Sequence, residues 1–144
     1  IIMSQPASTY LFVYGSLRSG FHHPAYAYIS RYFVLLGNAT TRGLLYDLGE
    51  YPAAKPTSTD QYIQGELYEI RQADEWNWAI AQLDDYEGVQ ADEDGPALYE
   101  RKLAEINLNG KLYMAWMYWY TGDVTGKPVV ASGDVLQYLQ QKNS

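Results

Sequence analysis

Residues 99–120 read YERKLAEINL, then NG, then KLYMAWMYWY. An Asn-Gly pair between two strand-like runs favours a two-residue hairpin turn. The segment therefore predicts strands at Tyr99–Leu108 and Lys111–Tyr120, joined at Asn109-Gly110. The second arm is apolar on both faces, which is typical of a strand buried on both sides, as in a barrel wall that helices cover.

Further strands and helices are expected on both sides of this hairpin. Trp76, Ala79, Ile80 and Leu83 recur at helical spacing and give one apolar face to a helix over 74–83. The other predicted elements are strands at 10–14, 34–36, 39–48 and 62–70, with breaks at Gly37-Asn38 and Gly43, an irregular crossing at 49–56, and short helices at 25–33 and 133–141. The order predicts an α+β fold on a small mixed sheet or barrel.

Length and charge narrow the class of protein. The 144 residues suit a single domain over 1–144, with a net charge of −7 and no cysteine. Nine of the 17 acidic residues lie between Gln72 and Glu100, where there is no Lys or Arg. Such a chain is a poor nucleic-acid binder. No apolar run is long enough to span a membrane, and no signal peptide is visible, so a cytoplasmic protein is expected.

Three local motifs lack residues that their usual ligands require. Gly15 to Gly20 has the glycine spacing of a phosphate loop, but Phe21-His22 follows where Lys and Ser or Thr are needed. The acidic stretch from Gln90 lacks oxygen donors at the first and twelfth positions of a calcium loop. His22 and His23 are adjacent and have no third ligand at a suitable spacing, so we expect no metal site.

Two segments remain as candidate functional sites. The strand that ends at Gly15-Ser16 leaves successive backbone N–H groups that could bind a carboxylate or oxyanion, although an ordinary turn explains the same residues. After the helix, a carboxylate leaning into a cleft near Tyr and Trp could act as a general acid or base. The chemistry alone does not choose among Asp84, Asp85 and Glu87.

Six short motifs, taken in order, resemble the γ-glutamylcyclotransferase-like superfamily, which includes the AIG2-like proteins and the γ-glutamylamine cyclotransferases. They cover about residues 10–122, and their joint order is specific where each alone is weak. They are FVYGSLR at 12–18, GLLYDLG at 43–49 followed by YPA at 51–53, QGELYEI at 64–70, LDDYEG at 83–88, YER at 99–101 and AWMY at 115–118. The resemblance implies a small mixed β-barrel with flanking helices, and residues 123–144 form a C-terminal extension with a short helix.

The resemblance also implies a reaction and its residues. The α-amine of a γ-glutamyl substrate attacks its own γ-carbonyl, 5-oxoproline closes, and an amine or amino acid leaves. By the same resemblance Glu87 is the catalytic general acid and base. The backbone of Tyr14, Gly15, Ser16 and Leu17 holds the α-carboxylate or the γ-carbonyl oxygen. No metal or redox cofactor is required.

Several points stay open at this level. The Tyr118 hydroxyl serves the pocket by resemblance, but a core tyrosine with a satisfied hydroxyl fits equally well. Arg101 is interpreted as structural, and the eight acids of the segment other than Glu87 as solvated surface charges. The γ-glutamyl substrate and the oligomeric state are not predicted. A non-catalytic module that binds a glutamyl or carboxylate ligand, and an interaction protein with an aromatic surface, are the alternative functions.

Overall fold

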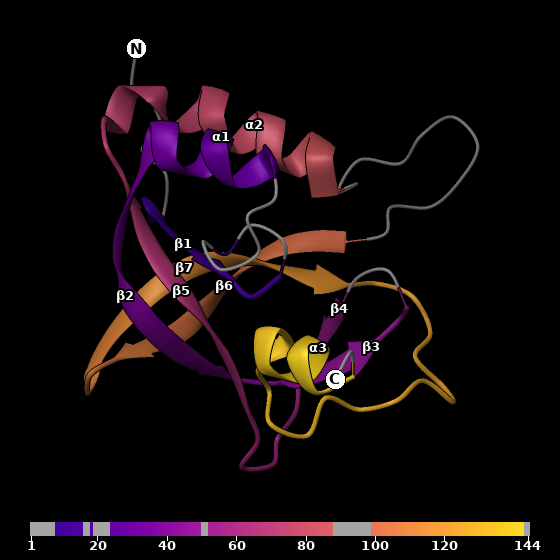
Figure 1. Cartoon of the computed structure of the whole chain (residues 1–144). Helices are drawn as coiled ribbons and strands as arrows, with labels where there is room; N and C mark the ends of the chain where they lie inside the picture. Colours follow the sequence, from indigo (N-terminus) through magenta and orange to yellow (C-terminus); the bar gives the residue numbers. More distant parts are fainter. Residues whose placement is uncertain (1–7, 16–17, 19–23, 50–51, 88–98, 143–144) are drawn as a thin grey trace.

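The computed structural model describes residues 8–15, 18, 24–49, 52–87 and 99–142 (Figure 1). Five strands close into a barrel, and β1 runs parallel to β7 but antiparallel to β5. In order around the barrel, the strands are β1 (Tyr10–Val13), β5 (Tyr62–Ile70), β2 (Phe33–Arg42), β6 (Tyr99–Leu108) and β7 (Lys111–Tyr120). The mixed barrel expected from the sequence is therefore confirmed.

The β6–β7 hairpin has the predicted boundaries. Its arms pair from Tyr99 opposite Tyr120 to Leu108 opposite Lys111. Asn109 and Gly110 have φ angles of 52° and 87°, the left-handed values that a tight hairpin turn requires. The expectation that β7 is buried on both faces holds only for its second half, because Leu112 and Met114 near the turn are 56% and 49% exposed.

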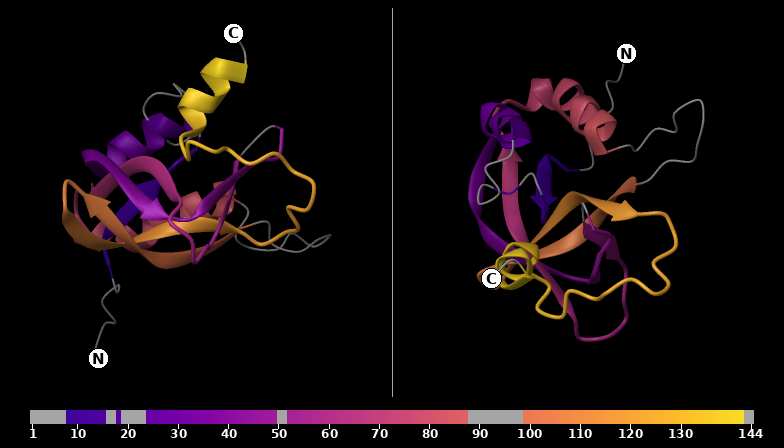
Figure 2. Two further views of the ribbon diagram at one scale, coloured as in Figure 1. Left: turned by 90° about the horizontal axis from the view of Figure 1, so that it is seen from below. Right: turned by 45° about the vertical axis from the view of Figure 1, so that its right-hand side comes forward.

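Two helices cover one side of the barrel. α1 (Pro24–Tyr32) and α2 (Trp76–Glu87) lie side by side there, and α2 follows the short 3₁₀ turn η2 (Ala73–Glu75) (Figures 1 and 2). α3 (Val135–Lys142) lies on the opposite side. Within the described part of the chain, none of these helices combines the length and apolar character needed to cross a bilayer.

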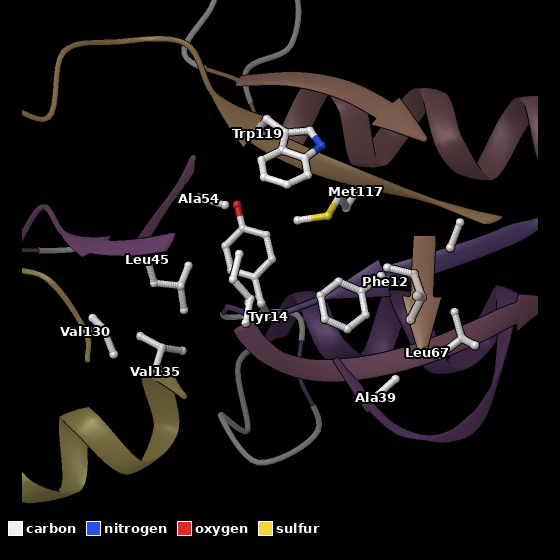
Figure 3. Packing of buried hydrophobic residues seen from close by; sticks show 13 residues of the cluster. Phe12, Tyr14, Ala39, Leu45, Ala54, Leu67, Met117, Trp119, Val130 and Val135 are labelled. Carbon is white, nitrogen blue, oxygen red and sulfur yellow. The ribbon is translucent and has the colours of Figure 1, made fainter. Parts of the chain in front are cut away.

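The barrel strands divide their side chains between two hydrophobic clusters. The first joins one face of the strands to α1 and α2, and it includes the predicted helix face of Trp76, Ala79, Ile80 and Leu83. The second takes the opposite strand face and continues to β3, β4 and α3 (Figure 3). Val130 and Val135 of the C-terminal segment belong to this second cluster, so that segment packs into the core.

Three local predictions were wrong. Gly37-Asn38 does not break β2, because the strand absorbs an irregular register between Leu35 and Gly37 and stays paired with β5. The expected irregular crossing contains β4 (Pro52–Lys55), which pairs with β3 (Leu44–Asp47) in a two-stranded sheet. A two-stranded sheet consists of edges, where proline is tolerated. The helix predicted over 74–83 continues to Glu87, so the acids after Leu83 are helical.

Candidate active site

The loop after β1 begins at a buried tyrosine. Tyr14 is 6% exposed and its ring lies in the second cluster, between Leu45, Ala54 and Phe12 (Figure 3). Its hydroxyl donates a hydrogen bond to the backbone carbonyl of Tyr118 on β7. The side chain of Tyr14 therefore anchors the start of the loop to β7.

The next described residues show how close the loop runs to its surroundings. A Cβ atom added at Gly15 would lie 3.3 Å from Cγ of Pro52. The Arg18 N–H donates to the Gly15 carbonyl at 2.9 Å, which ties the two ends of the segment together. Ser16 and Leu17, the other two predicted loop residues, lie outside the described residues.

Tyr118 connects this loop to α2. Its side chain is 3% exposed and belongs to the first cluster, under α1 and α2. Its hydroxyl donates to Oδ1 of Asp84 at 2.9 Å, while its backbone carbonyl accepts the bond from Tyr14. A phenol has a single proton, and here that proton is directed to Asp84.

Asp84 is fixed by a two-pronged ion pair. The Arg101 guanidinium donates from Nε to Oδ1 at 2.7 Å and from Nη2 to Oδ2 at 3.1 Å. The Asp84 and Arg101 side chains are 14% and 21% exposed, and the guanidinium carbon lies 4.7 Å from the ring centre of Trp116. Asp84 is therefore not the solvated surface charge that was predicted, because Arg101 and Tyr118 hold it against the barrel.

A second carboxylate on this side of the barrel was missed. Glu66 on β5 is only 5% exposed, and the Tyr68 hydroxyl donates to its Oε1 at 3.0 Å. Burial raises the pKa of Tyr68 above its usual range, and the nearby Glu66 carboxylate adds to this rise. The phenol therefore keeps its proton and stays a hydrogen-bond donor. Strand alternation could have found Glu66, since it shares a strand face with Tyr68 and Ile70.

Glu66, Tyr118 and Arg101 belong to one row of paired positions across four neighbouring strands, in which Val13 lies between Glu66 and Tyr118. Glu66 pairs with Val13, and Arg101 pairs with Tyr118. Leu11 pairs with Trp116 in the parallel β1–β7 pair, so Val13 lies beside Tyr118 two residues further along both strands. The row crosses β1 at Val13, the last residue of that strand, directly before the loop that starts at Tyr14. The structure thus brings Tyr14, Gly15, Tyr118 and the buried carboxylates to one end of the barrel.

Glu87, the predicted catalytic residue, is the last residue of α2, and its side chain lies outside the description. The acidic loop from Gln90 and the two histidines lie outside it as well. Among the residues that the structure describes, no group of three or more His, Cys, Asp or Glu side chains is placed to hold a metal ion.

Residues 11–137 match the family model described as gamma-glutamyl cyclotransferase, AIG2-like, and the chain belongs to this family. It is 32% identical over 114 residues to the gamma-L-glutamyl-butirosin B gamma-glutamyl cyclotransferase of Niallia circulans. This match covers 78% of this chain and 67% of that protein. It is also 32% identical over 127 residues to the gamma-glutamylcyclotransferase family protein YtfP of Escherichia coli K12, covering 88% and 95%.

Solved structures agree with this assignment. The solution NMR structure of YtfP from Escherichia coli matches with a TM-score of 0.62 at 32% identity, covering 90% of this chain and 97% of that one. The crystal structure of YkqA from Bacillus subtilis matches with a TM-score of 0.69 at 21% identity, and supports the fold alone. It covers 95% of this chain but 43% of YkqA. The family resemblance of the sequence motifs is confirmed, and the function is γ-glutamylcyclotransferase-like.

Proposed function

We propose that the protein cyclises a γ-glutamyl amine or peptide to 5-oxoproline and releases the amine, with Glu87 as the general acid and base. The observation that carries the proposal is the position of Tyr118. Its carbonyl holds Tyr14 at the start of the loop, and its hydroxyl holds Asp84 on α2. One residue therefore couples the two segments that the reaction needs.

The spacing along α2 supports the choice of Glu87. It follows Asp84 by three residues in the same helix, and positions three apart share a helix face. Asp84 is occupied by Arg101 and Tyr118, which makes it a poor candidate for moving protons. Asp85 lies on the exposed part of the helix. Of the three carboxylates that the sequence left open, Glu87 is the one we assign to chemistry.

The reaction is balanced by one proton-carrying group. The attacking nitrogen forms a bond to the γ-carbonyl carbon, and the bond from that carbon to the leaving nitrogen breaks. The attacking nitrogen starts as an ammonium group and ends as the lactam N–H, so it loses two protons. The leaving nitrogen starts as an amide N–H and ends as an ammonium group, so it gains two protons. A carboxylate between them can carry both in turn. Because attack is intramolecular, holding the glutamyl chain folded supplies much of the acceleration.

The backbone of the Tyr14–Leu17 loop is proposed to hold the substrate's α-carboxylate. Backbone N–H groups at such a turn suit a carboxylate, and Tyr14 fixes the loop to β7. The Tyr118 hydroxyl, whose proton goes to Asp84, can accept a hydrogen bond from the substrate's ammonium group. The Niallia circulans relative acts on a γ-glutamyl-protected metabolite by its name, so such compounds belong in the assay beside γ-glutamyl amino acids and amines.

The test measures 5-oxoproline formed from a panel of γ-glutamyl compounds by the parent protein and by Glu87→Gln. We expect kcat to fall by about 100-fold or more in Glu87→Gln, the usual contribution of a general acid or base. Asp85→Asn makes the same chemical change at an exposed helix position and should keep parental activity. Circular dichroism checks that both variants fold.

Full activity in Glu87→Gln would refute the catalytic assignment. Saturable binding of a panel compound by the parent without any 5-oxoproline would instead favour the non-catalytic binding module.

A further inference from the structure

Arg18 is a buried cation at the end of the candidate ligand-binding loop. The residue is 7% exposed, and its backbone N–H is bonded to the Gly15 carbonyl. Its Nη1 lies 2.9 Å from Oδ1 of Asp134, while its Nε–H has no hydrogen-bond partner among the described residues. A buried guanidinium depends strongly on its counter-ion, since an uncompensated charge in the interior is unfavourable.

Asp134 performs two tasks with the same oxygen. Its Oδ1 receives Nη1 of Arg18 and also the backbone N–H of Gln137 at 3.2 Å. Asp134 precedes α3, and its carbonyl accepts the Tyr138 N–H at 3.0 Å, so it is the N-cap of this helix. Although 116 residues separate them in the sequence, Asp134 connects the N-terminal loop directly to α3.

The segment that carries Asp134 is itself firmly attached to the barrel. The Gly133 carbonyl accepts the Gln64 N–H at 2.8 Å, and the Val130 N–H donates to the Leu45 carbonyl at 2.8 Å. Val135, the first residue of α3, is 4% exposed in the second cluster. Asp134 is therefore a fixed point against which Arg18 can be held.

We propose that Asp134 is a positioning residue for substrate binding. Through its ion pair it fixes Arg18, whose amide is bonded to the Gly15 carbonyl, and so holds the described ends of the loop whose backbone is proposed to receive the substrate's carboxylate. The inference rests on the proposed function and assigns the C-terminal segment a part in it. Asp134 touches no reacting atom in this scheme, so its loss should weaken substrate binding more than the chemical step.

Asp134→Asn removes the charge of the ion pair but keeps the helix cap, because asparagine caps a helix about as well as aspartate. We expect KM for an active γ-glutamyl compound to rise by about tenfold, with kcat within about threefold of the parent. Asp60→Asn is the matched control. It removes the carboxylate from the exposed pair between Arg42 and Asp60 and should leave KM unchanged. An unchanged KM in Asp134→Asn overturns the proposal, whatever happens to kcat.

Two further variants separate positioning from a merely structural role. Arg18→Gln should give a similar rise in KM, and the double variant with Asp134→Asn should be within about twofold of either single variant, because both remove the same contact. If the rises in KM of the two single variants multiplied in the double variant, the proposal would be overturned. Tyr138→Phe breaks the bond from α3 to Asp47 without touching the ion pair, and should not raise KM. An equal rise in KM in Tyr138→Phe would show that the attachment of α3 to the barrel, and not the ion pair, causes the effect.

Hydrogen exchange provides a readout that needs no activity. The Arg18 amide, bonded to Gly15, should exchange about tenfold faster or more in Asp134→Asn, while the Gly43 amide, bonded to Gln61, stays unchanged. Equal exchange of the Arg18 amide in parent and variant would overturn the positioning role. If the parent makes 5-oxoproline from none of the compounds, the proposed function fails, and this experiment still decides whether the ion pair holds the loop.

Discussion

The ion pair between Arg101 and Asp84 should be a major local contribution to stability. Arg101→Leu would leave Asp84, whose side chain is 14% exposed, with the Tyr118 hydroxyl as its described donor. Breaking a fully buried pair costs about 3–5 kcal/mol. An exposed pair contributes about 0–1 kcal/mol. With side chains 14% and 21% exposed, this pair lies between those limits, so we expect the free energy of unfolding to fall by about 2–3 kcal/mol.

Urea unfolding followed by circular dichroism measures this change. For a urea m-value of about 2 kcal/mol/M, the midpoint of unfolding should fall by about 1 M or more. Arg42→Leu is the control, because Arg42 and Asp60 are 49% and 89% exposed and lie 3.3 Å apart. It should leave the midpoint of urea unfolding close to that of the parent, because an exposed pair contributes little.

A double-mutant cycle isolates the pair from the contact of Arg101 with the Trp116 ring. Asp84→Asn, Arg101→Leu and the double variant should give a coupling energy of about 1–2 kcal/mol. If the two changes were additive, or if Arg101→Leu cost no more than Arg42→Leu, the reasoning from burial would be refuted.

Three further predictions concern buried backbone and phenol groups. Tyr28→Phe removes a buried hydroxyl that has no hydrogen-bond partner among the described residues. In urea titrations the free energy of unfolding should stay unchanged or rise by up to ~1 kcal/mol, and a clear decrease would contradict this. Burial raises the pKa of Tyr28 from 10.0 to about 12, and the neighbouring Tyr32 adds to this. The free energy of unfolding therefore does not depend on this phenol below pH 10 and falls as the pH rises from 10 toward 12. The difference in phenolate absorbance between the parent and Tyr28→Phe should show one such late titration, and a titration near pH 10 would argue against it. Gly133→Ala places a Cβ 1.8 Å from the Tyr62 carbonyl oxygen, at a φ of 71°, and should lower the free energy of unfolding by about 2–3 kcal/mol or more in thermal unfolding. Gly126→Ala has a similar φ of 78° but meets open space, so it should lower the free energy of unfolding by about 1 kcal/mol. Equal losses would show that φ alone matters.

The elements with strong local signals were predicted well. The Asn109-Gly110 turn and its two arms depend on turn chemistry and alternation, both readable over a few residues. Strand β4 was missed because Pro52 within it and Pro56 just after it argue against a strand, and only the partner strand β3 shows that Pro52 occupies an edge. The helix predicted to end at Leu83 continues to Glu87, and Asp84 in its last turn pairs with Arg101 on β6, a contact that the local pattern does not show.

The sequence singled out residues of which the structure brings three together, but it did not reveal their contacts, and their roles in a site stay predictions. Tyr14, Gly15 and Tyr118 do lie at one end of the barrel, while Ser16, Leu17 and the Glu87 side chain fall outside the described residues. The interpretation of Arg101 as structural agrees with its ion pair to Asp84. The buried Glu66 was missed because a single carboxylate within a good strand pattern resembles an exposed one.

The sequence by itself determined the hairpin and the apolar face of α2, because turn chemistry and periodicity act between near neighbours and are visible in the chain. The motif resemblance indicated the family and its barrel, and it favours Glu87 as the catalytic residue, which stays a prediction. Only the tertiary structure decided which charges are buried and which partners they meet. Arg18 and Asp134 are 116 residues apart, and Arg101 and Asp84 are 17 apart. Ion pairs depend on distance and on exclusion of water, and both are set only when the barrel closes.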